Sequence, residues 1–234
     1  MNVNIKFTDK NKNMEKDFRK FCLGRGMSGM MVDDVIKKGY QNPYILEERE
    51  LHATQLDIFS RLMIDRQLFF ASEFTDETCS IAVAQLLYLD TVSEDDITIN
   101  IMSPGGSCSA GLGLIDTIGR IKSDVRTVNI SSAYSMGLAL LVAGKKGKRV
   151  ALPHSEGLLH MPSGGVQGTS EDIQIVAKNI EHTKQVLFSF IGERTGHTAK
   201  EITEMAPRDR WMTADELLKL GFVDEIQKID WKKK

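Results

Sequence analysis

The chain has few cysteines, and their spacing excludes two classes of protein. Its 234 residues include three cysteines, Cys22, Cys79 and Cys108, which lie far apart and form no CxxC pair. Disulfide-rich secreted domains and zinc-binding modules both need more cysteines at closer spacing. We therefore expect a protein of a reducing compartment, assigned to the cytoplasm, with no disulfide framework and no metal site.

The sequence also lacks a long hydrophobic run and an excess of charge of either sign. Its longest apolar stretch, 138–143, is far shorter than the roughly 20 residues that span a bilayer. The first residues alternate charges with asparagine and contain no apolar core of a secretory signal. The formal net charge is −2. Neither a membrane nor a nucleic-acid partner is expected.

The hydrophobic pattern predicts an α/β fold after a polar extension. Residues 1–44 contain too few apolar side chains to close a core, so we interpret them as a propeptide or a disordered segment. Farther along, short apolar strands alternate with helices, which is typical of a parallel or mixed sheet. The predicted strands are 67–71, 97–102, 126–131, 148–152 and 157–161. The predicted helices are 56–64, 76–89, 110–121, 135–144, a long helix capped by Ser170, and two helices that begin with the capping boxes Thr198/Glu201 and Thr213/Glu216.

A serine at the start of an apolar helix is the first candidate for chemistry. In residues 131–138 a predicted strand ends, the chain turns, and the helix opens with Ser135. Backbone N–H groups in the first turn of a helix have no internal partner. A serine hydroxyl at this place can attack a carbonyl while those N–H groups receive the oxyanion. An ordinary serine N-cap is the alternative, and this segment alone favours it.

A glycine-rich turn supplies the second candidate element. Ser103, Pro104, Gly105 and Gly106 follow a predicted strand. Two successive glycines can direct consecutive N–H groups toward one point, which suits an oxyanion hole. A plain Pro-Gly turn is the alternative and is the better interpretation of this segment alone.

A hydroxyl nucleophile also needs a base and an acid that orients the base. Of the five histidines, His160 ends a short apolar strand, where sheets of this class collect their site residues, and His154 is its rival. Asp209, in a loop predicted between two helices, is the candidate acid. Half-exposed histidines and solvated charge clusters are common on protein surfaces, so each residue also has a plain interpretation.

From about residue 57 to residue 226 the sequence resembles the ClpP family. No single segment decides the resemblance, but the joint order of the segments is highly specific. The similar segments include Asp57-Ile58-Phe59-Ser60-Arg61-Leu62, Ser103-Pro104-Gly105-Gly106, Tyr134-Ser135-Met136-Gly137, His160-Met161-Pro162, Gly164-Gly165-Val166-Gln167-Gly168, Arg208-Asp209-Arg210 and Gly221-Phe222-Val223-Asp224.

The resemblance implies a ClpP/crotonase-like fold of repeated ββα-type units. The serine protease domain would span 57–234, with a protruding handle helix at about 163–191, and an axial-loop region would occupy 45–56. Two stacked heptameric rings would enclose the sites, and unfolded proteins would be the substrates. A Clp-family AAA+ unfoldase would feed the chamber and hydrolyse ATP, so this chain itself would bind no cofactor.

The resemblance also assigns roles to the candidate residues. Ser135 would be the nucleophile, His160 the general base and Asp209 its orienting acid. The backbone N–H groups of Gly106 and Met136 would form the oxyanion hole.

Several positions depart from the family's usual pattern. Asn usually precedes the Ser-Pro-Gly-Gly turn, a small residue precedes the nucleophile, and Gln follows the base. This chain has Met102, Tyr134 and Met161 at these places. The three expected catalytic residues are present, so these departures bear on substrate preference and ring coupling rather than on chemistry.

A further departure concerns the contact between the two rings. The acid that usually precedes the Arg-Asp pair, and that meets an arginine across the ring interface, is Pro207 here. We expect Asp172, near the start of the handle, to pair with Arg208 instead. The alternative is that Asp172 only complements the helix dipole.

Two other functions remain open at this stage. One is a non-catalytic or weakly active paralogue that serves as a scaffold in mixed rings. The other is a crotonase-like acyl-CoA enzyme, a class that also uses paired backbone N–H groups but needs a carboxylate acid/base in its pocket.

Overall fold

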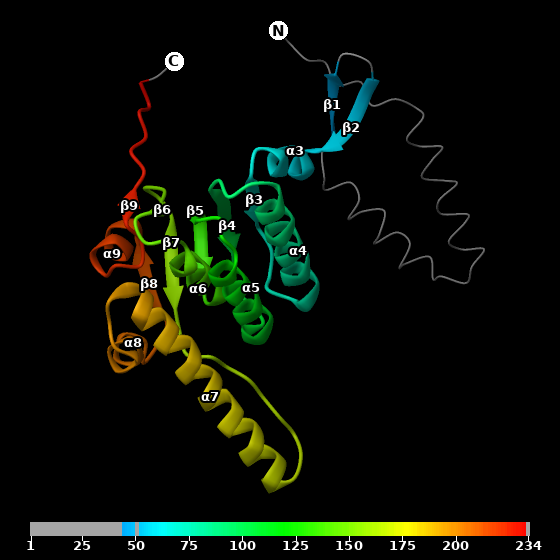
Figure 1. The fold of residues 1–234 in the computed structure, drawn as a ribbon. Helices are drawn as coiled ribbons and strands as arrows, with labels where there is room; N and C mark the ends of the chain where they lie inside the picture. Colours follow the sequence, from blue (N-terminus) through cyan, green and yellow to red (C-terminus); the bar gives the residue numbers. More distant parts are fainter. Residues whose placement is uncertain (1–43, 50–51, 233–234) are drawn as a thin grey trace, which may run out of the picture. The chain divides into compact units, whose positions relative to one another are not determined.

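The computed structural model describes residues 44–49 and 52–232 (Figure 1). These residues divide into two compact units, with the boundary between Arg61 and Leu62. The N-terminal extension therefore lies outside the described residues except for Tyr44, where β1 begins.

The first unit contains an antiparallel strand pair at the place of the expected axial-loop region. Strand β1 (Tyr44–Arg49) pairs with β2 (His52–Asp57), and α3 (Ile58–Ile64) follows directly. The Asp57 carboxylate accepts the N–H groups of Phe59 and Ser60 at 3.0 and 3.1 Å. These bonds satisfy donors at the start of the helix, so α3 begins two residues later than the hydrophobic spacing predicts.

The second unit contains a seven-stranded sheet with helices between its strands. The strand order is β3-β4-β5-β6-β9, and β7 joins β5 to β8. The strands are β3 (Gln67–Phe70), β4 (Ile97–Ser103), β5 (Val125–Tyr134), β6 (Arg149–Ala151), β7 (Glu156–Leu159), β8 (Arg210–Thr213) and β9 (Glu225–Ile226). The helices are α4 (Asp76–Val92), α5 (Cys108–Arg120), α6 (Met136–Ala143), α7 (Ser170–Thr195), α8 (Ala199–Met205) and α9 (Ala214–Lys219). The pairings are parallel except that of β7 with β8, which confirms the α/β class.

On the edge away from β4, strand β5 pairs with two different strands along its length. Its residues Thr127 to Asn129 lie beside β6, whereas Ser132 to Tyr134 lie beside β7. The strand therefore continues beyond residue 131, where the sequence predicts its end. The sequence predicts a turn at residues 132–134, but their hydrogen bonds with β7 keep them extended.

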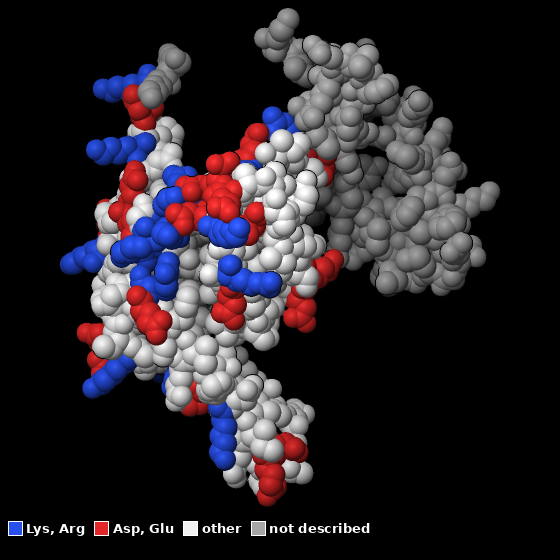
Figure 2. Space-filling view, viewed as in Figure 1, with Lys and Arg blue, Asp and Glu red and all other residues white. Residues whose placement is uncertain are grey.

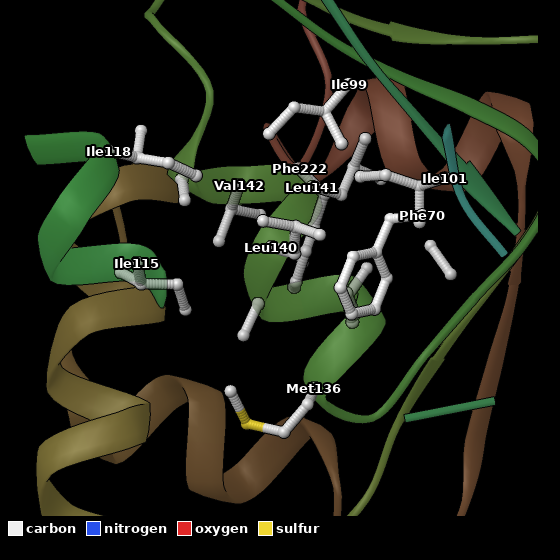
Figure 3. Close-up of a cluster of buried hydrophobic side chains, with 14 of the residues drawn as sticks. Phe70, Ile99, Ile101, Ile115, Ile118, Met136, Leu140, Leu141, Val142 and Phe222 are labelled. Carbon is white, nitrogen blue, oxygen red and sulfur yellow. The ribbon is translucent and has the colours of Figure 1, made fainter. Parts of the chain in front are cut away.

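Helix α6 lies at the centre of the core. All eight of its residues are buried, and Gly144 is its C-cap, as the apolar pattern predicts. Figure 3 shows its side chains between those of β4 and α5, including Leu140, Leu141, Val142, Ile99, Ile101, Ile115 and Ile118. A helix that is apolar on every side is stable only when other side chains cover it on every side. Packing in the core therefore holds α6, and with it the residue before its first turn, in one position.

Helix α7 projects from the rest of the second unit (Figure 1). Its buried residues all belong to its last third and are Leu187, Phe188, Ile191, Gly192 and Thr195. The prediction that Ser170 caps this helix is wrong, because Thr169 is the N-cap. Thr169 donates its N–H to Asp172 Oδ2 at 3.0 Å, and its Oγ1 accepts the Asp172 N–H at 3.2 Å. This reciprocal pair occupies the capping position one residue earlier.

The C-terminal region contains one confirmed feature and one that the sequence does not predict. The capping boxes at Thr198/Glu201 and Thr213/Glu216 are both formed. Strand β8 has only four residues, and it exists because it pairs with β7. Asp209 lies in the loop after α8, as predicted, but the element that follows it is strand β8, where the sequence predicts no strand.

The charged surface of the described residues is mixed in sign. Figure 2 shows acidic and basic side chains interspersed on the visible face. Across the described part of the chain, no helix combines the length and apolarity needed to cross a membrane. The same residues contain no group of three or more His, Cys, Asp or Glu side chains that could hold a metal ion.

A buried ion pair fastens the start of β9 to β6. The Arg149 side chain is fully buried, and its Nη2 and Nε donate to the two carboxylate oxygens of Asp224 at 2.6 and 2.8 Å. Its Nη1 donates to the Arg194 carbonyl oxygen at 2.8 Å. Burial by itself raises the pKa of Asp224, but hydrogen bonds from Arg149 and its charge outweigh burial and hold that pKa well below its usual value.

We expect Asp224→Asn to lower the free energy of unfolding at neutral pH by about 3–5 kcal/mol, because the buried Arg149 loses its counter-ion. A carboxyl with a depressed folded-state pKa stabilises the fold above its unfolded pKa, about 3.9 for Asp. That contribution disappears as pH falls through the folded-state pKa. The difference in free energy of unfolding between the wild type and Asp224→Asn should therefore narrow only below pH about 4. Urea unfolding at neutral and acid pH measures this, and equal stability at neutral pH would contradict it.

Candidate active site

Ser135 joins β5 to α6 in a strained backbone conformation. Its φ of 54° and ψ of −116° lie in a region that residues other than glycine rarely adopt. Its N–H donates to the Leu158 carbonyl oxygen at 2.9 Å, and its own carbonyl oxygen accepts the Leu138 N–H at 3.0 Å. Its side chain makes no capping hydrogen bond to the helix. An ordinary N-cap serine would make that bond. The Ser135 hydroxyl is therefore not used for capping and is available to react.

The glycine turn after β4 lies directly against Ser135. A Cβ atom placed on Gly105 would lie 2.6 Å from Ser135 Cβ and 3.1 Å from Ser135 Oγ. Gly105 also has a φ of +95°. Only glycine permits both this backbone conformation and this close approach. The turn is further held by Phe74, which donates its N–H to the Gly105 carbonyl oxygen at 2.8 Å.

The two predicted oxyanion-hole donors come from these adjoining segments. Met136 is the first residue of α6, where helical geometry leaves the N–H without an internal acceptor. Gly106 adjoins Gly105 and has a φ of +142°. The N–H of Gly105 donates to Ser103 Oγ at 3.2 Å. The prediction that the turn presents two consecutive free N–H donors is therefore wrong.

Strand pairing places His160 beside Ser135. In the parallel ladder of β5 and β7, Tyr134 lies opposite Leu158. Ser135 follows directly after Tyr134, and His160 lies two residues beyond Leu158, so both leave the carboxyl edge of the sheet at the same place. The hydrogen bond from the Ser135 N–H to Leu158 fixes this register.

Asp209 reaches the same edge from the antiparallel strand β8. Arg210, the first residue of β8, lies opposite Leu159, and Asp209 comes directly before it. His160 Nδ1 and Asp209 Oδ1 are 4.0 Å apart. The His160 side chain is 30% exposed and that of Asp209 is 65% exposed. The two groups face each other at a separation longer than a hydrogen bond.

The rival histidine lies at the other end of β7. His154 is exposed and precedes the strand, whereas His160 follows it. The four residues of β7 lie between them and correspond to about 13 Å of extended chain. Since Ser135 bonds to the carboxyl half of β7, the structure favours His160 as the neighbour of the serine.

Comparison with known proteins gives the chain a family. A model of the Clp protease family matches residues 49–230. The chain belongs to the Clp protease family. Proteins named ATP-dependent Clp protease proteolytic subunit are similar to it over most of their length. Those of Bacteroides fragilis (strain YCH46) and Bacteroides thetaiotaomicron are each 50% identical over 90% of this chain and 97% of their own. That of Porphyromonas gingivalis is 42% identical over 90% of this chain and 96% of its own.

The structure of this Clp family member brings together the segments that sequence reasoning selected. Ser135, Gly105 and the residues at the ends of β7 and β8 lie at one edge of the sheet. The direct packing of Gly105 on Ser135 is not predictable from the sequence. Two glycines in succession after a strand were the available signal, but composition does not say which backbone segment they approach.

Proposed function

We propose that this chain is the proteolytic subunit of an ATP-dependent Clp protease, a serine endopeptidase that hydrolyses unfolded polypeptides to short peptides. The observation that carries this proposal is Ser135, which has a strained backbone and whose side chain makes no capping hydrogen bond. It packs against Gly105 and lies next to the strand that leads to His160. The names of the similar Bacteroides and Porphyromonas proteins support the same conclusion.

In the proposed mechanism, Ser135 Oγ attacks the carbonyl carbon of the scissile peptide bond. His160 accepts the hydroxyl proton on Nε2, the ring nitrogen that does not face Asp209. The N–H groups of Gly106 and Met136 donate to the oxygen that becomes negative. His160 then gives the proton to the leaving amine, and water releases the acyl group from Ser135 by the same steps.

Asp209 has the role of holding the imidazole in the required tautomer and orientation. Its separation of 4.0 Å from His160 Nδ1 must shorten to the roughly 2.8 Å of a charge-assisted hydrogen bond. Catalytic hydrogen bonds are often long without substrate and tighten in the Michaelis complex. Asp209 is the member of the set with the most freedom to move, because it is exposed and lies just outside β8.

A fluorophosphonate probe tests this function against the two alternatives. We expect rapid covalent labelling of Ser135, located by mass spectrometry of the digested protein, together with hydrolysis of a short fluorogenic peptide. A scaffold subunit would remain unlabelled in assembled rings. An acyl-CoA enzyme would turn over its thioester substrate without labelling, and either result would reject the peptidase.

We further propose that the chain works in two stacked heptameric rings and depends on a Clp-family AAA+ unfoldase. Ile173 and Ile175 are exposed in the projecting N-terminal part of α7. Apolar side chains at this place could be covered by the other ring, which supports an interlocking handle. In this assembly the partner binds and hydrolyses ATP, and this chain needs no cofactor.

The assembly predicts different rates for peptides and folded proteins. The purified chain alone should cleave a short fluorogenic peptide without ATP. It should degrade a stable folded protein only slowly unless the unfoldase and ATP are present, because a closed chamber excludes folded chains. Loss of fluorescence from a folded fluorescent protein measures this. Rapid ATP-independent loss would contradict the chamber.

The contact between rings is proposed to include Asp172 and Arg208. Acidic side chains gather at the free end of α7 in Figure 2, where Glu171 and Asp172 form the first turn. The Asp172 carboxylate already caps the helix through Thr169, yet it stays exposed on its outer side. Arg208 is exposed and has no ion pair within the described residues of its own chain.

We expect Arg208→Ala to shift double rings toward single rings at low salt, and raised salt to narrow the difference from the wild type, because salt screens the ion pair that the wild type still has. One exposed ion pair contributes only about 0–1 kcal/mol, but many copies act across two rings. Native mass spectrometry at fixed subunit concentration measures the ratio. Asp172→Ala should give the same shift, and Glu171→Ala, which changes the neighbouring acid, is the matched control. Double rings that persist in both variants would reject the pair.

A further inference from the structure

Two aromatic side chains meet on the sheet next to the candidate active site. The rings of Tyr134 and Trp211 have centroids 5.0 Å apart and an interplanar angle of 75°. This edge-to-face geometry is a favourable arrangement for an aromatic pair. The Tyr134 hydroxyl donates to Glu156 Oε2 at 3.3 Å. Burial raises the pKa of Tyr134 and the charge of Glu156 raises it further, so the phenol remains a donor.

The pair connects two strands that are not neighbours. Tyr134 of β5 lies opposite Leu158 of β7, which in turn lies opposite Trp211 of β8. Two strand spacings, about 9.6 Å, therefore separate the backbones that carry the two rings. Only large side chains can meet over Leu158. The small residue that usually precedes the nucleophile in this family could not span this distance.

The three strands linked in this way are those that lead to the catalytic candidates. Tyr134 directly precedes Ser135, Leu158 lies two residues before His160, and Trp211 lies two residues after Asp209. The aromatic contact thus links, through side chains, the strand that precedes the nucleophile to the strand that follows the acid.

We propose that Tyr134 and Trp211 are positioning residues, whose contact across β7 fixes β8 relative to β5 and so keeps Asp209 where it can orient His160. This inference rests on the proposed peptidase function. Asp209 needs such support because its side chain is 65% exposed and stands 4.0 Å from His160. Trp211 is itself 53% exposed, so its contact with Tyr134 rather than core burial fixes its place.

The test measures kcat, KM and the rate of fluorophosphonate labelling in Tyr134→Ala, Trp211→Ala and Trp211→Phe. We expect each alanine variant to lose roughly 10- to 100-fold in kcat and in labelling rate, with KM within about twofold, because a small misplacement of a catalytic group slows only the chemical step. Trp211→Phe keeps a ring and should recover most of the activity. Trp231→Ala removes the other tryptophan, which is exposed near the C-terminus, and should match the wild type.

The double variant Tyr134→Ala/Trp211→Ala separates positioning from general destabilisation. If the rings act as one unit, its kcat should equal that of the slower single variant, whereas independent losses would multiply. The proposal is overturned if both alanine variants keep more than about half of kcat, or if the losses multiply. It is also overturned if KM rises at constant kcat, or if Trp211→Phe is as slow as Trp211→Ala. If Trp211→Ala does not fold, Tyr134→Ala still tests the contact, because it removes the other ring of the pair.

The same measurements distinguish this proposal from the proposed function. If Ser135 is not labelled in the wild type, the peptidase assignment fails. If Ser135 is labelled and the tyrosine and tryptophan variants react at the wild-type rate, only the positioning role fails.

Discussion

Replacing Ser135 with alanine is expected to reduce peptide hydrolysis by roughly 10⁴-fold or more, because hydroxyl, base and orienting acid act as one unit. The alanine side chain removes only Oγ, and the backbone bond from residue 135 to Leu158 can still form. The fold and the ring assembly should therefore persist. The measurement is the initial rate on a short fluorogenic peptide, with native mass spectrometry as the check on assembly.

Ser131→Ala is the matched control for this experiment. Ser131 is an exposed serine on β5, the strand that precedes Ser135, and its loss should leave the rate unchanged. Retention of more than a few per cent of the wild-type rate by Ser135→Ala, with contaminating peptidases excluded, would remove Ser135 from the role of nucleophile. Loss of activity through failed assembly would appear as a changed mass distribution.

Replacing His160 with alanine is expected to reduce the rate about as far as the serine variant, because no other group in the proposed set can accept the serine proton. His154→Ala provides a matched histidine control, since that side chain is exposed and lies before the opposite end of β7. It should keep activity near the wild-type level. The comparison uses the same peptide and the same fluorophosphonate labelling assay.

If His154→Ala were inactive and His160→Ala active, the assignment of His160 as the base from the register of β7 would be wrong. An inactive His160→Ala that still labels rapidly with the probe would place the histidine in a later step than activation of Ser135. Equal activity of both variants with the wild type would mean that some other group serves as base.

Much of the fold is visible in the hydrophobic pattern. The apolar stretch ending at Gly144 predicts a helix that is buried on all sides, and α6 is such a helix. The boxes that begin at Thr198 and Thr213 form as predicted, because a cap depends on residues only three apart. Errors arise where two local candidates compete, as when Thr169 rather than Ser170 caps α7.

Strands that exist only through their partners are the elements that the pattern does not show. Residues 132–134 and strand β8 are short, and neither has an alternating apolar run long enough to separate it from a turn. Their ladders with β7 join residues far apart in the chain. Such pairing depends on the whole sheet, so a local window of sequence does not contain it.

For the site, local sequence settles which residue types stand at which element ends: a serine at a helix start, glycines after a strand, a histidine at a strand end. Resemblance to the ClpP family then assigns them roles that stay predictions until the variants are measured. The tertiary structure alone decides that Gly105 packs on Ser135, that His160 and not His154 shares its edge of the sheet, and that the Asp209 loop is joined to it through β8. The reason is physical: caps and helices depend on neighbours within a turn, whereas a site of this kind depends on the register of strands brought together from distant parts of the chain.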